Sequence, residues 1–306
     1  MRTNEYGVAL VMAMGVVALA AVSATAILVS LSTWSRQDEL TADHAQAQQL
    51  IQAGADWARA VLSDDRRATG DIDHPGEAWA LRLPPIPVEK GELVGYIEDQ
   101  QGLFNLNNLV SNGKLDAIQY ARFQRLLSIL GLRAELADAV VDWIDADNQP
   151  QPNNGAEDET YLALDPAYRT SNQPLIDIDE LALVRGFDAG VRKRLAPFVT
   201  ALPGTTAINV NTAPPEVLAA VVDGLDIDAA RTLVMRRNQA FYRDNAAFRS
   251  QLGKGANVSD QDIRVGSDYF VATLRVSSGG AQARGKVLFA RLDARRWPAI
   301  VWRKYQ

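Results

Sequence analysis

Residues 8–31 read VALVMAMGVVALAAVSATAILVSL and contain no charged side chain. A helix needs about 20 apolar residues to span the hydrocarbon core of a bilayer, so this run is long enough to cross a membrane. The next segment, residues 35–49, is polar and rich in alanine and glutamine, which favour helix, and the first proline is Pro75. We therefore expect one helix from about Val8 to about Ser63.

The second half of the expected helix carries one apolar stripe. Its members recur every three or four residues, which places them on the same side of a helix. This half is therefore expected to dock onto a globular domain through Leu50, Ile51, Gly54, Trp57, Ala58, Val61 and Leu62.

The polar leader MRTNEYG ends in Gly7, directly against the apolar run. A secretory signal peptide cleaved near Ala21–Ala26 is one interpretation, but the run exceeds the usual signal core of about 7–15 residues. The junction resembles that of type IV prepilins, which implies cleavage by a prepilin peptidase between Gly7 and Val8 and N-methylation of Val8. Prepilins usually carry glutamate at the fifth mature position, where this chain has Met12. A subunit without that carboxylate cannot neutralise the N-terminal amine of a neighbouring subunit.

Composition excludes several classes of protein. The 306 residues include no cysteine, so thiol catalysis, disulfides and thiolate zinc sites are impossible. His44 and His74 are the two histidines, and no nucleophile motif lies near either. The net charge of -6 argues against a protein whose main work is binding nucleic acid phosphates. We therefore expect neither an enzyme nor a nucleic acid partner.

The sequence has β character at residues 93–99 and again near its end. Segments 269–277, 284–292 and 299–303 read as strands, and SSGGAQA between the first two is a hairpin signal. We expect these strands to form a small antiparallel sheet on the apolar stripe of the helix. The basic residues of this region are expected on a solvated face or in a subunit contact: Arg291, Arg295, Arg296 and Arg303.

The region between the strands reads as helical. Three patterns of helix, glycine and helix centre on Gly131, Gly186 and Gly224, and glycine readily closes a helix in the left-handed conformation. Asp226 or Asp228 is expected to cap the helix after the third glycine. DNA-binding helix-hairpin-helix units share this pattern, but acid at the turns would repel phosphate. Packing of the hairpins into an all-α insertion is therefore favoured.

The segment between Ala134 and Tyr168 is acidic and has no lysine, arginine or histidine. Carboxylates this dense repel one another unless a cation lies among them. Asp145 and Asp147 alternate like the first ligands of an EF-hand loop, and oxygen ligands on a flexible loop suit calcium. The later spacing differs from an EF-hand, so a solvated acidic loop is one alternative. A metal-dependent hydrolase is another, although no general base is identifiable.

Several stretches together resemble the type II secretion system protein K family, the large minor pseudopilins of the general secretion pathway. The resemblance covers nearly the whole chain, and this family also lacks the glutamate that Met12 replaces. The stretches are IEDQQGLFNLNNL at 97–109, DWIDAD at 142–147, GAEDETY at 155–161, YRTSNQPL at 168–175 and INVNTAPPEVL at 208–218.

The resemblance implies an α+β pseudopilin fold, with a long N-terminal membrane-spanning helix, a small antiparallel sheet and a large all-α insertion containing helix-hairpin-helix-like units. Members bind calcium in the insertion, which implies a structural calcium site here. The implied ligands are Asp145, Asp147, Glu157 and Asp158, with Asp142 and Glu180 as further candidates. The implied organisation is a leader at 1–7, a transmembrane part at 8–31, an α/β pseudopilin domain at 32–104 and 266–306, and the insertion at 105–265.

The function implied by the resemblance is that of a minor pseudopilin at the tip of the periplasmic pseudopilus, initiating or capping its assembly for export of folded proteins across the outer membrane. Such a protein crosses the inner membrane of a Gram-negative bacterium once, with its globular part in the periplasm. The implied partners are the minor pseudopilins of types I and J, the major pseudopilin, the prepilin peptidase, the inner-membrane secretion platform and the secreted substrates. A membrane-anchored DNA-binding protein of an uptake machine is the alternative, and it would need a basic helical region.

Overall fold

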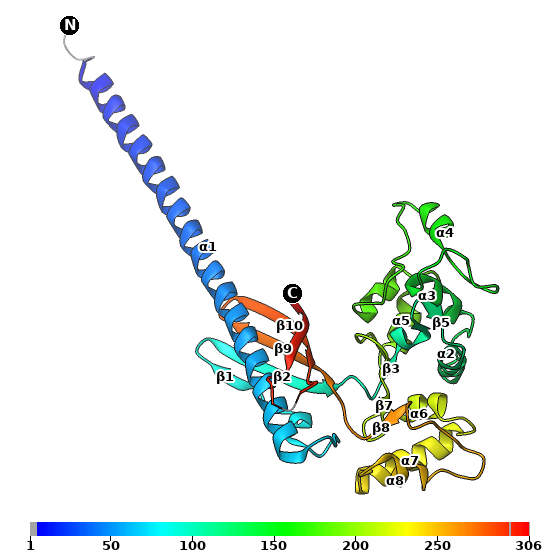
Figure 1. Ribbon diagram of the computed structural model, residues 1–306. Coiled ribbons are helices and arrows are strands. Elements are labelled where there is room, and N and C mark those ends of the chain that lie inside the picture. The colour runs from blue at the N-terminus through cyan, green and yellow to red at the C-terminus, as the bar shows by residue number, and fades with distance from the viewer. Residues whose placement is uncertain (1–4, 294, 306) are drawn as a thin grey trace.

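The computed structural model describes residues 5–293 and 295–305, so most of the expected leader, residues 1–4, lies outside the described residues. Helix α1 (Glu5–Thr69) is continuous and projects far beyond the rest of the molecule (Figure 1). It is long and apolar enough to cross a membrane once, and its most apolar part is fully exposed. The prediction of one unbroken helix is confirmed, and the helix ends six residues later than expected because Gly70, with φ +78°, closes it.

One antiparallel sheet packs beside the second half of α1, with strand order β1-β2-β9-β10-β11. Strands β9 and β10 form a tight hairpin in which Ser278 pairs with Ala281 across Gly279 and Gly280. Strand β10 therefore starts at Ala281, whereas the sequence predicted a start at residue 284. The strands are β1 (Ile86–Val88), β2 (Gly91–Asp99), β9 (Tyr269–Ser278), β10 (Ala281–Ala290) and β11 (Ala299–Tyr305).

The core of this domain lies between α1 and the sheet. Ile51, Ala58 and Leu62 of the expected stripe are buried, each with at most 1% exposure. Full burial of an isoleucine or leucine side chain, such as Ile51 or Leu62, contributes about 1.5–3 kcal/mol. Gly54 allows close approach, because a Cβ there would lie 3.0 Å from the Leu274 side chain. Trp57 was expected in the stripe but is 46% exposed.

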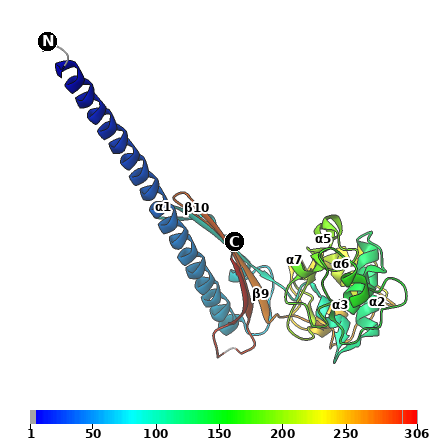
Figure 2. The same cartoon turned by 90° about the horizontal axis from the view of Figure 1, so that it is seen from above.

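A large insertion connects β2 to β9 and lies beside the sheet, on the side away from α1 (Figures 1 and 2). Its helices bury one continuous apolar core. The α-helices are α2 (Ala117–Ile129), α3 (Leu136–Ile144), α4 (Asp158–Leu162), α5 (Ala189–Leu195), α6 (Pro215–Val221), α7 (Ile227–Gln239) and α8 (Asn245–Arg249). The short 3₁₀ helices are η2 (Leu106–Leu109) and η3 (Ile178–Ala182), with η1 (Ala78–Ala80) preceding the sheet.

The insertion was expected to be all-α. This is wrong in detail, because short pairs of strands connect its loops by backbone hydrogen bonds. Strands β3 and β6, like β7 and β8, pair in parallel, whereas β4 and β5 pair antiparallel. Their bounds are β3 (Phe104–Asn105), β4 (Val110–Ser111), β5 (Lys114–Leu115), β6 (Val199–Thr200), β7 (Ile208–Asn209) and β8 (Ile263–Arg264).

Glycines do occupy the turns of the three repeated helical patterns. Gly131, Gly186 and Gly224 have φ of +64°, +86° and +73°, the left-handed region that side chains with a Cβ disfavour. Asp226 caps α7 as predicted, because its side chain accepts hydrogen bonds from the Asp228 and Ala229 amides. The helix before Gly186 is the short η3 instead of an α-helix.

Candidate metal centre and interdomain joint

The C-terminal end of α3 and the loop after it bring three predicted ligands together. Asp145 terminates α3, and its amide still donates to the Val141 carbonyl. The carboxylates of Asp145, Asp147 and Glu157 each offer an oxygen, and these oxygens all lie within 4.8 Å of one another. Asp145 and Glu157 are buried, whereas Asp147 is exposed. The group is therefore a cluster of three carboxylates that is exposed to solvent at Asp147.

Three buried oxygens of this cluster lack hydrogen-bond donors. Among the described residues, Asp145 Oδ1 and both carboxylate oxygens of Glu157 have no hydrogen-bond partner. Burial, followed by the neighbouring carboxylates, raises the pKa of Glu157 to about 8 and that of Asp145 to about 6. Buried polar atoms are normally paired, and several converging carboxylates are stabilised by a hard cation such as Ca²⁺. The donor set therefore fits calcium.

Asp142 lies close to this cluster and fixes the conformation of the 145–157 loop. Its carboxylate accepts hydrogen bonds from the amides of Gln151 and Ala156, the latter at 2.6 Å. A Cβ at position 155 would collide with this carboxylate, so the loop needs Gly155 there. Burial raises the pKa of Asp142 to about 6. Asp142 thus holds the ligand loop in place. Its carboxylate oxygens already accept hydrogen bonds from the loop amides.

Asp158 and Glu180 have other partners. The Asp158 carboxylate accepts hydrogen bonds from Thr170 and Arg169, and the Thr170 hydrogen bonds lower its pKa. Glu180 completes a capping box at the start of η3 with Asp177. The structure therefore assigns both side chains to local structure and does not bring them into the group of Asp145, Asp147 and Glu157.

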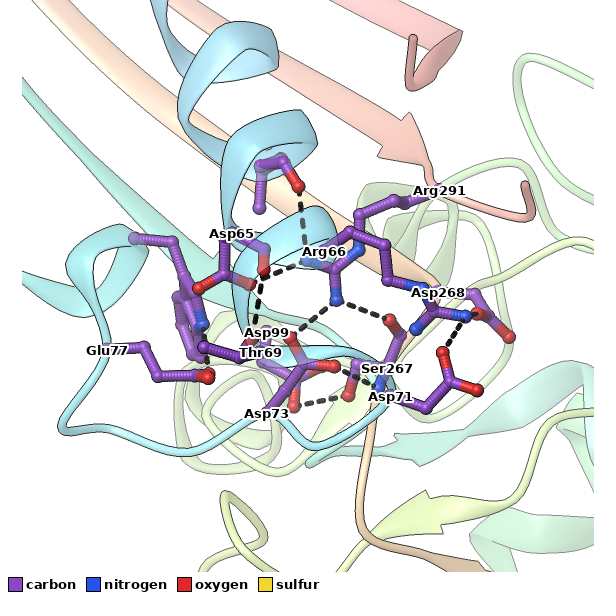
Figure 3. A network of polar contacts seen from close by, with 12 residues as sticks. Asp65, Arg66, Thr69, Asp71, Asp73, Glu77, Asp99, Ser267, Asp268 and Arg291 are labelled. Atoms are coloured by element: carbon purple, nitrogen blue, oxygen red, sulfur yellow. Dashed lines mark hydrogen bonds and ion pairs between the residues drawn. The ribbon is translucent and has the colours of Figure 1, made fainter. Parts of the chain in front are cut away.

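A second polar centre, which the sequence did not reveal, lies between the sheet domain and the insertion (Figure 3). Arg291 was expected on a solvated face or in a subunit contact, but it is 1% exposed within the chain itself. Its guanidinium donates to Asp65 Oδ2 at 2.9 Å, to Asp73 Oδ1 at 2.5 Å and to the Ser267 carbonyl at 3.1 Å. It also lies 4.6 Å from the centre of the Phe270 ring. The side chain thereby links the end of α1 to the segment that returns from the insertion.

Asp99 extends the same network to the other connecting segment. Its Oδ2 accepts hydrogen bonds from the side chains of Asn209, Thr212 and Ser267. Burial raises the pKa of this carboxyl. Because Asp99 ends β2 and Ser267 precedes β9, the network joins both chain crossings between the domains. We call the network of Asp65, Asp73, Asp99, Ser267 and Arg291 the interdomain joint.

Comparison with known proteins identifies the family. Sequence models described as type II secretion system protein K match residues 102–204 and 208–265. A type II secretion system protein K of Pseudomonas aeruginosa is 37% identical over 91% of this chain and 86% of its own length. Its counterpart in Klebsiella pneumoniae is 36% identical over 100% of this chain and 98% of its own. The chain belongs to the type II secretion system protein K family.

A solved member of the protein K family shares the architecture. The matching chain comes from the GspK-GspI-GspJ complex of the enterotoxigenic Escherichia coli type 2 secretion system. The TM-score is 0.76 at 25% sequence identity, over 90% of this chain and 99% of that chain. The long N-terminal helix, sheet and insertion are therefore the protein K fold.

The residues that the prepilin resemblance assigns to processing and assembly lie on α1. Gly7 and Val8 are within the helix, and Met12 is 65% exposed on it. The side chains of α1 are exposed from residue 7 to residue 42, and Leu40 already lies beside the β9–β10 turn, where a Cβ at Gly280 would be 3.1 Å from its Cδ2. In this protein K chain, the exposed apolar half of α1 is therefore compatible with a single membrane anchor.

Proposed function

We propose that this chain is a minor pseudopilin that forms the tip of the periplasmic pseudopilus together with subunits of types I and J. The observation that carries the proposal is its match, over 90% of its length, to a chain solved in a GspK-GspI-GspJ complex. In this role α1 crosses the inner membrane once and the sheet domain and insertion lie in the periplasm. The exposed apolar half of α1 supports that placement.

The chemistry of Met12 supports a position with no subunit above it. Cleavage between Gly7 and Val8 by a prepilin peptidase would leave a positively charged Val8 amine, which is then N-methylated. In a bundle of apolar helices a buried charge needs a partner, and a thioether provides none. This chain could accept subunits beneath it, whose own carboxylates would neutralise its Val8 amine, but it could not supply the carboxylate that neutralises the amine of a subunit above.

The shape of the molecule supports the same position. The insertion lies beside the sheet and projects away from α1 (Figure 2). A filament in which identical subunits repeat along an axis has to accommodate such a mass at every step, whereas the end of the filament accommodates it once. We propose that the insertion faces outward at the tip, where it initiates or caps assembly and is available to secreted proteins.

Co-purification tests this assembly. The full chain, expressed with types I and J and extracted in detergent, is expected to purify as one complex containing all three. Edman sequencing and mass spectrometry should find a chain that begins at methylated Val8 only when prepilin peptidase is present. Purification without either partner would contradict the tip complex, and cleavage near Ala26 would contradict the prepilin processing. Met12→Glu is expected not to improve secretion of a reporter enzyme.

We also propose that the insertion holds a structural calcium ion on Asp145, Asp147 and Glu157. The support is the set of buried, unpartnered oxygens that Asp145 and Glu157 present among the described residues. The ion would supply the positive charge that these carboxylates lack and would hold the 145–157 loop on α3. Asp142 would keep that loop in place through the amides of Gln151 and Ala156.

Thermal unfolding tests the calcium site. Calcium at about one hundred times its dissociation constant stabilises a protein by about 2.7 kcal/mol, so the melting temperature of the chelated chain should rise by several degrees on re-addition. Glu157→Gln should abolish most of this rise, whereas Glu159→Gln, at an exposed neighbouring position, should not. An unchanged melting temperature after chelation and re-addition would remove the proposal.

A further inference from the structure

A second group of buried carboxylates lies at the interdomain joint, far along the chain from the 145–157 loop. Asp65 is in the last turns of α1, and Asp73 and Glu77 follow it on the segment that leads to η1. Their relative exposures are 7%, 0% and 7%. One oxygen from each lies within 4.8 Å of the others, and Figure 3 shows the three side chains converging below the end of α1.

The charges of this group do not balance. Asp65, Asp73, Glu77 and Asp99 are all acidic and buried, and Arg291 is the buried arginine that pairs with two of them. Arg66, the other arginine drawn in Figure 3, is paired with Asp71 and Asp268 instead. The buried Arg237 interacts electrostatically with Asp99, so Arg291 is the arginine paired with Asp65 and Asp73. Uncompensated buried charge is strongly destabilising, so the group requires further positive charge or protons.

Glu77 identifies where that charge is missing. Its Oε2 accepts hydrogen bonds from the Trp79 indole at 2.8 Å and from the His74 amide at 3.0 Å. Its Oε1 is buried and has no hydrogen-bond partner among the described residues. Arg291 donates hydrogen bonds to Asp65 Oδ2 and Asp73 Oδ1. It donates none to Glu77 Oε1. A buried carboxylate that has an unpartnered oxygen and is grouped with two further carboxylates is an environment that favours a cation.

We propose that Asp65, Asp73 and Glu77 bind a second divalent cation, of the oxygen-preferring class that includes Ca²⁺. The ion would tie the end of α1 to the 70–77 segment. Asp73 also accepts a hydrogen bond from the Ser267 amide at 2.7 Å, so the ion would stiffen the crossing from the insertion to β9 as well. Burial raises the pKa of Asp73 to about 7 and also raises that of Asp65, which agrees with a site that lacks positive charge.

Terbium luminescence tests this site, because Tb³⁺ replaces Ca²⁺ at oxygen sites and is excited through nearby tryptophan. The Trp79 indole donates to Glu77, so it lies beside the proposed ion. The parent protein should be the full chain in detergent with Asp145→Asn and Glu157→Gln, which removes the insertion site. We expect this parent to show tryptophan-sensitised Tb³⁺ emission that excess Ca²⁺ abolishes.

Two further variants assign the emission to the joint. Glu77→Gln keeps an oxygen for the Trp79 indole but removes the charge, and should weaken Tb³⁺ affinity at least tenfold. Trp79→Phe should remove most of the emission while Ca²⁺ still raises the melting temperature. The matched control Glu98→Gln, at an exposed residue paired with Arg82, should resemble the parent.

Either of two results would overturn the proposal. The first is Tb³⁺ emission that is absent from the parent or unchanged by Glu77→Gln. The second is a parent whose melting temperature depends on pH but not on Ca²⁺, which would show that protons neutralise the joint. Because the insertion site is removed in the parent, loss of this second site would leave the proposal for the 145–157 loop untouched.

Discussion

Replacing Arg291 with methionine should lower the free energy of unfolding by about 3–5 kcal/mol, the usual cost of removing one partner of a buried ion pair. The methionine retains most of the apolar stem that packs near Phe270 but leaves Asp65 and Asp73 without their shared guanidinium. The hydrogen bond to the Ser267 carbonyl is lost as well. Asp65 and Asp73 would then be buried without an arginine partner.

The size of the effect should depend on pH. Asp73 already has a raised pKa of about 7, and loss of Arg291 raises it further, so the carboxyl takes up a proton more readily in the variant. Protonation removes part of the uncompensated charge. The loss should therefore lie at the upper end of the range at pH 8 and become smaller at pH 5.5.

Thermal and urea unfolding of the full chain in detergent measure this loss. A change of 1 kcal/mol shifts the melting temperature of a domain of this size by about 2–4 °C, so Arg291→Met should lower it by about 6–20 °C. Arg303→Met, at an exposed residue of β11, is the matched control and should change it by less than about 2 °C. A loss below about 1 kcal/mol, or equal to that of the control, would refute the reasoning.

Three further predictions follow from the fold and the candidate metal site. Ile51→Ala removes a side chain buried between α1 and the sheet and should cost about 2–5 kcal/mol in urea unfolding; a loss under 1 kcal/mol would mean that α1 is not docked there. Asp226→Ala removes the α7 cap and should cost about 1 kcal/mol, whereas Asp228→Ala, which loses only an exposed pair, should cost less; equal losses would contradict the cap. Without calcium, the raised pKa of Glu157, about 8, means that the folded state binds the extra proton, so the melting temperature should fall as pH rises from about 4.5 to 8; a rise over that interval would contradict it.

Much of the fold could be predicted because the deciding patterns are local. The uncharged run at 8–31 and the spacing of Ile51, Ala58 and Leu62 define α1 and its buried face. The glycine turns and the Asp226 cap depend on residues within a few positions of one another. Trp57 departs from its stripe, at 46% exposure, because the spacing of apolar residues marks a helix face but not where the contact with another element ends.

The sites depended more on contacts between distant segments. Asp145, Asp147 and Glu157 were predicted together because one loop carries them. Asp158 lies next to Glu157 in sequence, yet Thr170 and Arg169 draw its carboxylate away. Arg291 reads as one of several basic residues near the chain end, and its burial arises from pairing with Asp65 and Asp73, more than 200 positions earlier. The acidic residues that follow α1 could have indicated a polar centre there. Nothing in the sequence indicated that Arg291 would be their partner.

Immunogold labelling of pseudopili tests the tip assignment most directly. Pseudopili assembled by overproducing the major pseudopilin, in cells that also make this chain with an epitope inserted after Gly204, an exposed turn residue of the insertion, would be sheared and imaged by electron microscopy. The account predicts one cluster of gold at one end of each filament and none along the shaft. Regular labelling along the shaft would contradict the tip position, and filaments that lack label at both ends would show that the chain is not part of the finished pseudopilus.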